Sequence, residues 1–210
     1  MTRAVFLSAS VPDPSKPHFV EPSDVVDIAA AVKALVYVVL GRRPLIWDGH
    51  PAITPMIWAA ASSLNVDYSE WVTLYQSRYF EDQYPEDNGR FRNTQYVPAA
   101  KSRPDKSEEH RLKVSLYKMR CRMFKNHAFE TAVFIGGMQG IVDEFELIGR
   151  VCPDARRIPV LSTGGATRLL GERLVHTDLD LERLANDIDY VPLLYEFCRI
   201  DPSEPRGSMS

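Results

Sequence analysis

Residues 131–148 read TAVFIGGMQGIVDEFELI. Residues 132–135 are all apolar, which is typical of a short strand buried on both faces. Gly136 and Gly137 end this run, and after Gly140 the apolar residues recur at helical spacing, at Ile141, Phe145 and Ile148. The sequence therefore predicts a strand, a glycine turn and a helix in succession.

A turn of this kind can bind a ligand or can simply connect a strand to a helix. Glycine lets the backbone approach a ligand closely, and the first turn of a helix offers free N–H donors and a partial positive charge. These properties suit an anionic group, phosphate above all, at Gly136, Gly137, Met138 and Gly140. The simpler interpretation is that two adjacent glycines only close the turn.

The chain predicts two further turns of the same type. Residues 44–47 form a short apolar strand that ends at Asp48-Gly49-His50, and Thr54 follows as the N-cap of a helix. We expect ligand contacts at Gly49, His50 and Thr54, and His50 is either a ligand contact, an acid or base, or incidental. Residues 158–161 predict another strand, and its turn adds candidate contacts at Thr163, Gly164 and Gly165.

Residues 4–7 predict the first strand, which ends near Ser8 and Ser10. The two hydroxyls are candidates for binding a ligand, with capping of the loop backbone as the alternative.

Alternating strands and helices predict an α/β fold, a single Rossmann-like domain with a mostly parallel sheet and helices on both faces. Ligands bind such sheets at the carboxyl ends of the strands. We place the domain at residues 1–200, with an irregular loop at 76–106 and a flexible tail at 201–210. The aromatic residues of the loop either stack on a base or pack the loop against the body.

Composition excludes several classes of function. The chain has 210 residues, 45% of them hydrophobic, and a formal net charge of −3, which argues against binding to long nucleic acid or to an anionic membrane. Three widely spaced cysteines, with no pattern of metal ligands, predict reduced thiols, no metal and no cofactor. We find no secretory signal and expect a cytoplasmic protein.

The turns do not have the spacing of the GxGxxG dinucleotide fingerprint or of the GxxxxGK[ST] phosphate loop. A standard NAD-binding site and a P-loop site are therefore not expected.

The arrangement resembles the SLOG superfamily, which includes the LOG phosphoribohydrolases, the Smf/DprA proteins and nucleotide-sensing domains. The segment VFLSAS at 5–10 looks like the first strand of LOG proteins, and LIWDGH at 45–50 stands at their second glycine turn. The segment FIGGMQGIVDE at 134–144 is similar to the motif PGGxGTxxE, with one extra residue between Gly137 and Gly140, no leading proline and Ile141 in place of threonine.

The resemblance implies a nucleotide-binding domain and, in LOG enzymes, cleavage of an N-glycosidic bond by an arginine and a glutamate. Arg120 matches the arginine, and either Asp143 or Glu144 matches the glutamate. Two acids at the start of a helix are also ordinary complements of the helix dipole.

Three hypotheses follow for the function. The first is a sensor domain that binds a nucleotide or a ligand derived from NAD or ADP-ribose. The second is a nucleoside 5'-monophosphate phosphoribohydrolase, and the third is a structural protein with an empty cleft. We also expect a homo-oligomer and, for a sensor, an effector protein as partner.

Overall fold

The structure is a computed structural model that describes residues 3–20, 23–64, 66–174 and 178–207. Six strands form one sheet in the order β4-β3-β2-β1-β5-β6, and every pair of neighbours is parallel. The predicted single α/β domain with a parallel sheet is therefore confirmed. The strands are β1 (Ala4–Ser10), β2 (Leu45–Trp47), β3 (Val72–Ser77), β4 (Asn93–Val97), β5 (Phe129–Gly136) and β6 (Arg156–Val160).

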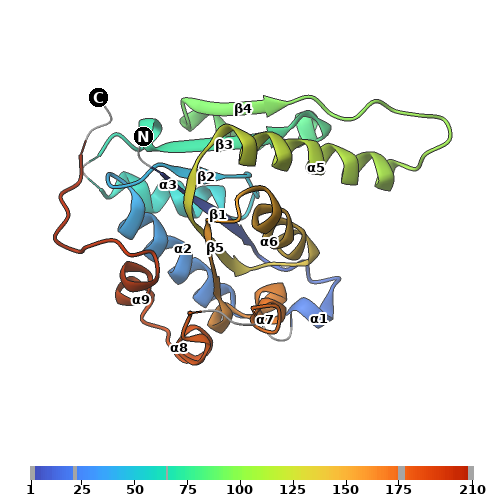
Figure 1. Cartoon of the computed structure of the whole chain (residues 1–210). Coiled ribbons are helices and arrows are strands. Elements are labelled where there is room, and N and C mark those ends of the chain that lie inside the picture. The colour runs from blue at the N-terminus through green and yellow to red at the C-terminus, as the bar shows by residue number, and fades with distance from the viewer. Residues whose placement is uncertain (1–2, 21–22, 65, 175–177, 208–210) are drawn as a thin grey trace.

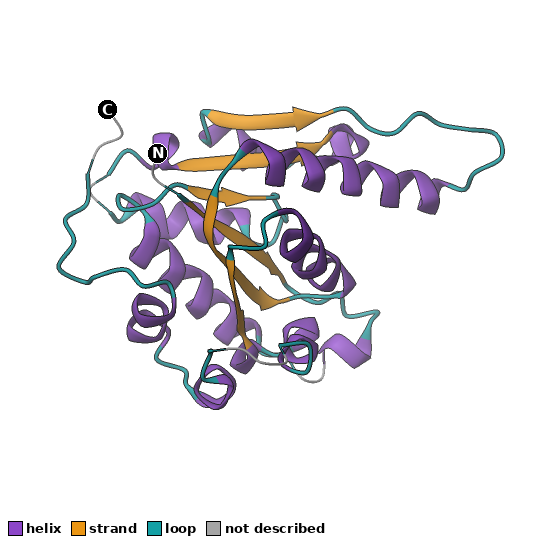
Figure 2. Cartoon of the chain, in the orientation of Figure 1, coloured by secondary structure: helices purple, strands orange, loops and turns teal. Residues whose placement is uncertain are grey.

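Helices cover both faces of the sheet (Figures 1 and 2). The α-helices are α1 (Pro17–Val20), α2 (Val25–Val39), α3 (Thr54–Ser62), α4 (Tyr68–Trp71), α5 (Glu108–Asn126), α6 (Gln139–Val151), α7 (Arg168–Gly171), α8 (Leu181–Asn186) and α9 (Tyr190–Phe197). The 3-10 helices are η1 (Arg78–Gln83), η2 (Glu86–Arg90), η3 (Leu161–Thr163) and η4 (Gly165–Thr167).

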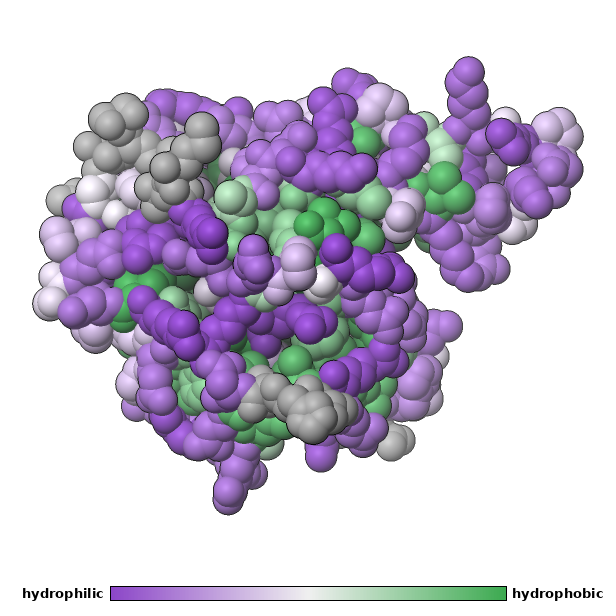
Figure 3. Space-filling model, in the orientation of Figure 1, coloured by the Kyte–Doolittle hydropathy of each residue, from purple (hydrophilic) through white to green (hydrophobic). Residues whose placement is uncertain are grey.

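The buried side chains form two hydrophobic clusters, one on each face of the sheet. Because successive residues of a strand point to opposite faces, Val5 and Leu7 of β1 join α2, α3 and α9 in one cluster. Phe6 joins α5 and α6 in the other cluster. Hydrophilic residues cover most of the face in Figure 3, and hydrophobic residues show mainly where this face is hollowed.

The strand order reverses at β1. From β1 the chain builds β2, β3 and β4 outward on one side, and it then returns through α5 to place β5 on the other side of β1. The carboxyl ends of β1 and β5 therefore flank the switch point, where parallel α/β sheets bind their ligands.

Two segments differ from their predicted form. Residues 76–106 are more regular than expected, because they contain the end of β3, η1, η2 and β4. Residues 201–207 are mostly exposed but are held to the domain by hydrogen bonds: Arg42 Nε donates to the Glu204 carbonyl at 2.7 Å, and Gly207 N donates to the Gly41 carbonyl at 2.7 Å. The rest of the predicted tail, 208–210, lies outside the described residues.

The glycine turns after β5 and β6 are packed against each other. The Thr163 hydroxyl accepts a hydrogen bond from Gly136 N at 2.9 Å, and Ala166 N donates to the Gly137 carbonyl at 2.8 Å. Gly165 has a φ of 61°, and a Cβ added to it would lie 2.7 Å from the Gly137 carbonyl oxygen. The turn after β6 thus supports the turn after β5.

We predict that Gly165→Ala destabilises the fold. A side chain would strain this positive-φ backbone, at about 1–3 kcal/mol, and would also clash with the neighbouring turn. Urea denaturation should therefore show a free energy of unfolding lower by at least about 2 kcal/mol. Gly89→Ala is the matched control, because an added Cβ there meets nothing within 4 Å. Equal effects of the two substitutions would contradict this account of the packing.

Candidate functional site

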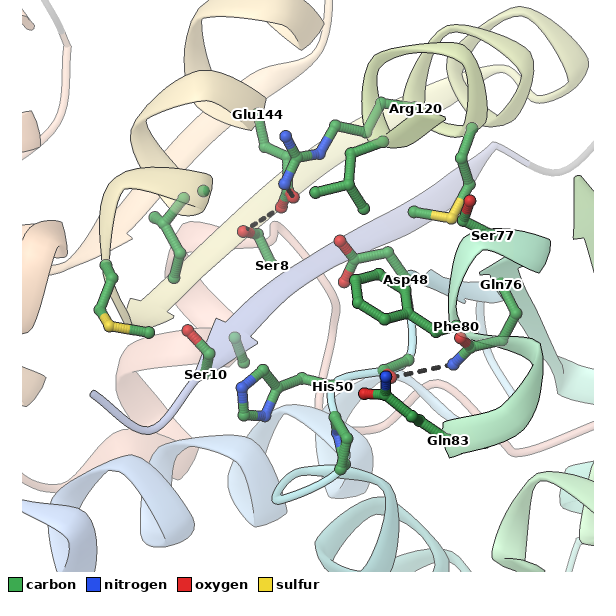
Figure 4. Close-up of a pocket in the computed structure, with 18 of the residues that line it drawn as sticks. Ser8, Ser10, Asp48, His50, Gln76, Ser77, Phe80, Gln83, Arg120 and Glu144 are labelled. Carbon is green, nitrogen blue, oxygen red and sulfur yellow. Dashed lines mark hydrogen bonds and ion pairs between the residues drawn. The ribbon is translucent and has the colours of Figure 1, made fainter. Parts of the chain in front are cut away.

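A pocket of about 370 Å³ opens at the carboxyl ends of the strands, beside the switch point. Figure 4 shows side chains from both halves of the sheet converging on it. The lining comes from the ends of β1, β2 and β3, from η1 and from the facing parts of α5 and α6: Ser8, Ala9, Ser10, Asp48, Gly49, His50, Pro51, Gln76, Ser77, Phe80, Gln83, Tyr84, Pro85, Leu116, Met119, Arg120, Met138, Gly140, Ile141 and Glu144.

Glu144 is the most constrained polar residue of the pocket. Its side chain is 4% exposed, and its two carboxylate oxygens have different partners. Arg120 Nη2 lies 2.5 Å from Oε1, and the Ser8 hydroxyl donates to Oε2 at 2.5 Å. This group of contacts joins α6, α5 and β1, so the buried charge of Glu144 is paired as well as hydrogen-bonded.

Asp48 lies beside this ion pair, at the end of β2. Burial raises the pKa of Asp48 well above its usual value, and the nearby carboxylate of Glu144, with which Asp48 shares a hydrogen bond, raises it further. Arg120 opposes both effects. Burial and the neighbouring carboxyl thus both favour the protonated form of Asp48, since two close carboxylates do not both ionise easily.

Arg120 is enclosed by these acids. Burial disfavours its charged form, but Glu144 and Asp48 outweigh burial and raise the pKa of the guanidinium. Arg120 Nε is buried without a hydrogen-bond partner, while Nη1 lies 3.9 Å from Asp143.

His50 is a neutral group facing the same pocket. Burial lowers its pKa, and Glu144 only partly opposes the effect. His50 Nδ1 accepts a hydrogen bond from Ala52 N at 3.3 Å, so the ring proton is assigned to Nε2. Ser10 and His50 lie near each other in Figure 4. Together they offer uncharged hydrogen-bonding groups.

Helix α6 points the start of its first turn at the pocket through Met138 and Gly140. No side chain caps this helix at Met138. Ile141 N already donates to the Met138 carbonyl at 2.9 Å, so it is the N–H groups of Gln139 and Gly140 that suit an anionic group.

The structure separates the predicted site residues into two groups. Ser8, Ser10, Gly49, His50, Arg120, Met138, Gly140 and Glu144 line the pocket, whereas Gly136, Gly137, Thr163, Gly164, Gly165, Thr54 and Asp143 do not. Thr54 is fully buried as the first residue of α3, and Ile53 rather than Thr54 is the N-cap. The Thr54 hydroxyl donates to the His50 carbonyl at 3.3 Å. Thr54 therefore stabilises the turn after β2 and does not line the pocket.

The two candidates for the glutamate of the LOG motif are also separated. Glu144 faces the pocket, whereas Asp143 is 53% exposed and lies in a groove between α5 and α6. Of the two acids, Glu144 therefore has the position that the resemblance requires.

Six polar or aromatic residues of the pocket were not among the predicted contacts, although the aromatic residues of segment 76–106 were considered for stacking on a base. Asp48 stands directly after the second predicted strand, and Gln76 and Ser77 end β3, so strand ends were the available signal. Phe80, Gln83 and Tyr84 belong to the segment predicted as irregular. Neither hydrophobic periodicity nor a turn motif shows there which side chains point toward the pocket.

Residues 18–198 match the model of the SLOG cluster3 family. The chain belongs to the SLOG cluster3 family. The resemblance to the SLOG superfamily is therefore confirmed over most of the chain. Among solved structures, this SLOG protein is similar to the X-ray structure of TM1055, a target of the Northeast Structural Genomics Consortium. The two are 15% identical with a TM-score of 0.44, over 92% of this chain and 98% of that chain. No curated protein matches the sequence.

The described residues were also considered for membrane spans and for metal ligands. None of the helices in this part of the chain combines the length and hydrophobicity needed to cross a bilayer. No group of three or more histidine, cysteine and acidic side chains among these residues could hold a metal ion.

We predict that Glu144→Ala destabilises the SLOG domain by roughly 3–5 kcal/mol, because the buried guanidinium of Arg120 loses its ion-pair partner. Asp143→Ala, one position away on the exposed side of α6, should change the free energy of unfolding by less than about 0.5 kcal/mol. Chemical denaturation of both variants checks the prediction, and similar losses would show that the Arg120–Glu144 contact is not the important one.

We further predict that Asp48 makes stability depend on pH. The pKa of Asp48 is higher in the folded protein than in the unfolded chain, so above about pH 4 the folded protein binds more protons. The free energy of unfolding should then fall as the pH rises, until Asp48 ionises in the folded protein. Asp48→Asn should lack this loss. Urea denaturation from about pH 4 to about pH 8 compares the two proteins, and parallel curves would contradict the assignment.

Proposed function

We propose that this SLOG domain is a binding module for a single nucleotide or a small nucleotide-derived ligand. The observation that carries the proposal is the pocket at the switch point, with an uncapped helix start at one part of its wall and an aromatic side chain at another. Its volume of about 370 Å³ is near the low end of small-molecule sites, which span roughly 300–1,000 Å³. That size favours one nucleotide over a complete dinucleotide.

The chemistry of the wall suggests how such a ligand is oriented. A phosphate suits the first turn of α6, where Met138 and Gly140 line the pocket near Ser10. A base suits the ring of Phe80, because every nucleobase has a face that stacks on an aromatic ring. Sugar hydroxyls between these points would meet Asp48 and Glu144, which accept or donate hydrogen bonds.

Binding is favoured over catalysis by the state of Glu144. Both of its oxygens already have short contacts, to Arg120 and to Ser8. A carboxylate that activates water needs an oxygen within reach of that water, and in the present arrangement the strongest partners of Glu144 are protein groups.

A second function, hydrolysis of the N-glycosidic bond, is supported by Asp48. Burial and the neighbouring Glu144 favour the protonated form of Asp48, and Glu144 itself pairs with Arg120. A carboxyl that can give up a proton beside a second carboxyl is the arrangement used in glycosidic bond cleavage. In that reaction Asp48 would give its proton to the departing base as the bond between base and sugar breaks. A water molecule would then add to the sugar carbon and return a proton to Asp48.

We predict that nucleoside 5'-monophosphates raise the melting temperature and are recovered intact. Ligand at about 100 times its Kd adds about 2.7 kcal/mol of apparent stability. Phe80→Ala should weaken binding by roughly 5- to 150-fold, because base stacking contributes about 1–3 kcal/mol. Tyr117→Ala is the control, since Tyr117 is an exposed aromatic residue outside the pocket.

Calorimetry measures the affinities, and chromatography of the same mixtures detects products. If free base is released by the natural chain but not by Asp48→Asn, the protein is a hydrolase and not a binding module. Failure of every nucleotide to bind would overturn both functions.

A further inference from the structure

Gln76 holds a fixed amide group at the end of β3. Its side chain is buried, with the residue 5% exposed, and Nε2 donates to the Gly49 carbonyl at 2.9 Å. A carbonyl oxygen accepts hydrogen bonds but cannot donate one, so this contact determines which end of the amide faces Gly49. Figure 4 shows the hydrogen bond beside Phe80 and Gln83.

Gly49 is required for this contact. A Cβ added to Gly49 would lie 1.8 Å from Gln76 Nε2 and 2.7 Å from a methyl group of Leu74, and the φ of Gly49 is 75°. The glycine of the second turn therefore lets the Gln76 amide reach the backbone, which is a different role from a direct ligand contact.

The orientation leaves Gln76 Oε1 open to the pocket. No described residue donates to this oxygen, and it is not among the fully buried polar atoms that lack a partner. Gln76 lines the pocket, so the accessible surface of its amide faces the pocket interior. A ligand group that meets Oε1 must donate a hydrogen bond if the acceptor is to be satisfied.

The neighbouring hydroxyl has the same preference. Tyr84 Oη donates its proton to the Ser77 carbonyl at 2.8 Å, so the phenol oxygen is left to the pocket as an acceptor. Burial, followed by the nearby charge of Glu81, raises the pKa of Tyr84 to about 12, and the phenol therefore stays protonated. This part of the wall offers acceptors next to the ring of Phe80.

We infer that Gln76 selects a nucleobase with an exocyclic amino group over the corresponding oxo base. The inference rests on the proposed binding of a nucleotide with its base at Phe80. An amino group donates to Gln76 Oε1, whereas an oxo group would put two acceptor oxygens against each other. Sites that hydrogen-bond one ligand group reject an analogue that leaves their polar groups unpaired.

The test compares AMP with IMP, and CMP with UMP, by isothermal titration calorimetry on the whole chain. Within each pair the exocyclic amino group becomes an oxo group and the adjacent ring nitrogen becomes an N–H donor. We expect the amino member of at least one pair to bind about tenfold more tightly or better. In Gln76→Leu this preference should fall to near unity, while the affinity for ribose 5-phosphate, which has no base, should not change.

Gln83→Leu is the matched control, because Gln83 is an exposed amide at the rim of the same pocket and should keep the preference. Nucleotides that bind with equal affinity in each pair would overturn the selection by Gln76 and leave the proposed function intact. No binding by any nucleotide would overturn both. If Gln76→Leu does not fold, equal affinities within each pair for the natural chain still overturn the selection.

Discussion

The buried ion pair of Arg120 and Glu144 is the interaction on which the pocket depends. A charged carboxylate that is 4% exposed is tolerated only because a guanidinium and a hydroxyl satisfy it. Those partners come from α5 and β1, so the pairing fixes two helices against the first strand. Burial raises the pKa of Asp48, and Glu144 adds to this effect while Arg120 opposes it. The ion pair that fixes the packing therefore also contributes to the electrostatics of the site.

The glycine turns have different roles in the site. At the turn after β5 the two glycines face the turn after β6, and only the start of α6 reaches the pocket. Gly165 lies against the backbone of Gly136 and Gly137, and Ala166 N donates to the Gly137 carbonyl, so the turn after β6 supports the turn after β5. Similar motifs in the sequence thus have unlike roles, because strand order decides which turn faces the switch point and which lies behind it.

The sequence predicted the fold class and about half of the pocket wall. Strands such as β5 and helices such as α6 have strong periodicity, so local pattern sufficed, and Ser8, His50 and Glu144 follow from strand ends and from the motif. Gln76 was missed because its role arises from a contact between neighbouring strand ends, its hydrogen bond to the Gly49 carbonyl. For Phe80 the sequence left open whether the ring stacks on a base or packs the loop, because an irregular segment does not show where its side chains point. Thr163 was assigned to the ligand because a hydroxyl at a strand end looks the same whether it meets a ligand or, as here, the backbone of Gly136.

Both ends of the described chain are fastened to the turn that precedes β2. Val5 N donates to the Pro44 carbonyl, and Gly207 N donates to the Gly41 carbonyl. This turn lies at the amino ends of the strands, whereas the pocket opens at their carboxyl ends. A domain or label joined to either end would lie at the amino ends of the strands, away from the pocket mouth at their carboxyl ends. The geometry therefore allows tethering to a surface or fusion to another protein without obstructing access by small molecules.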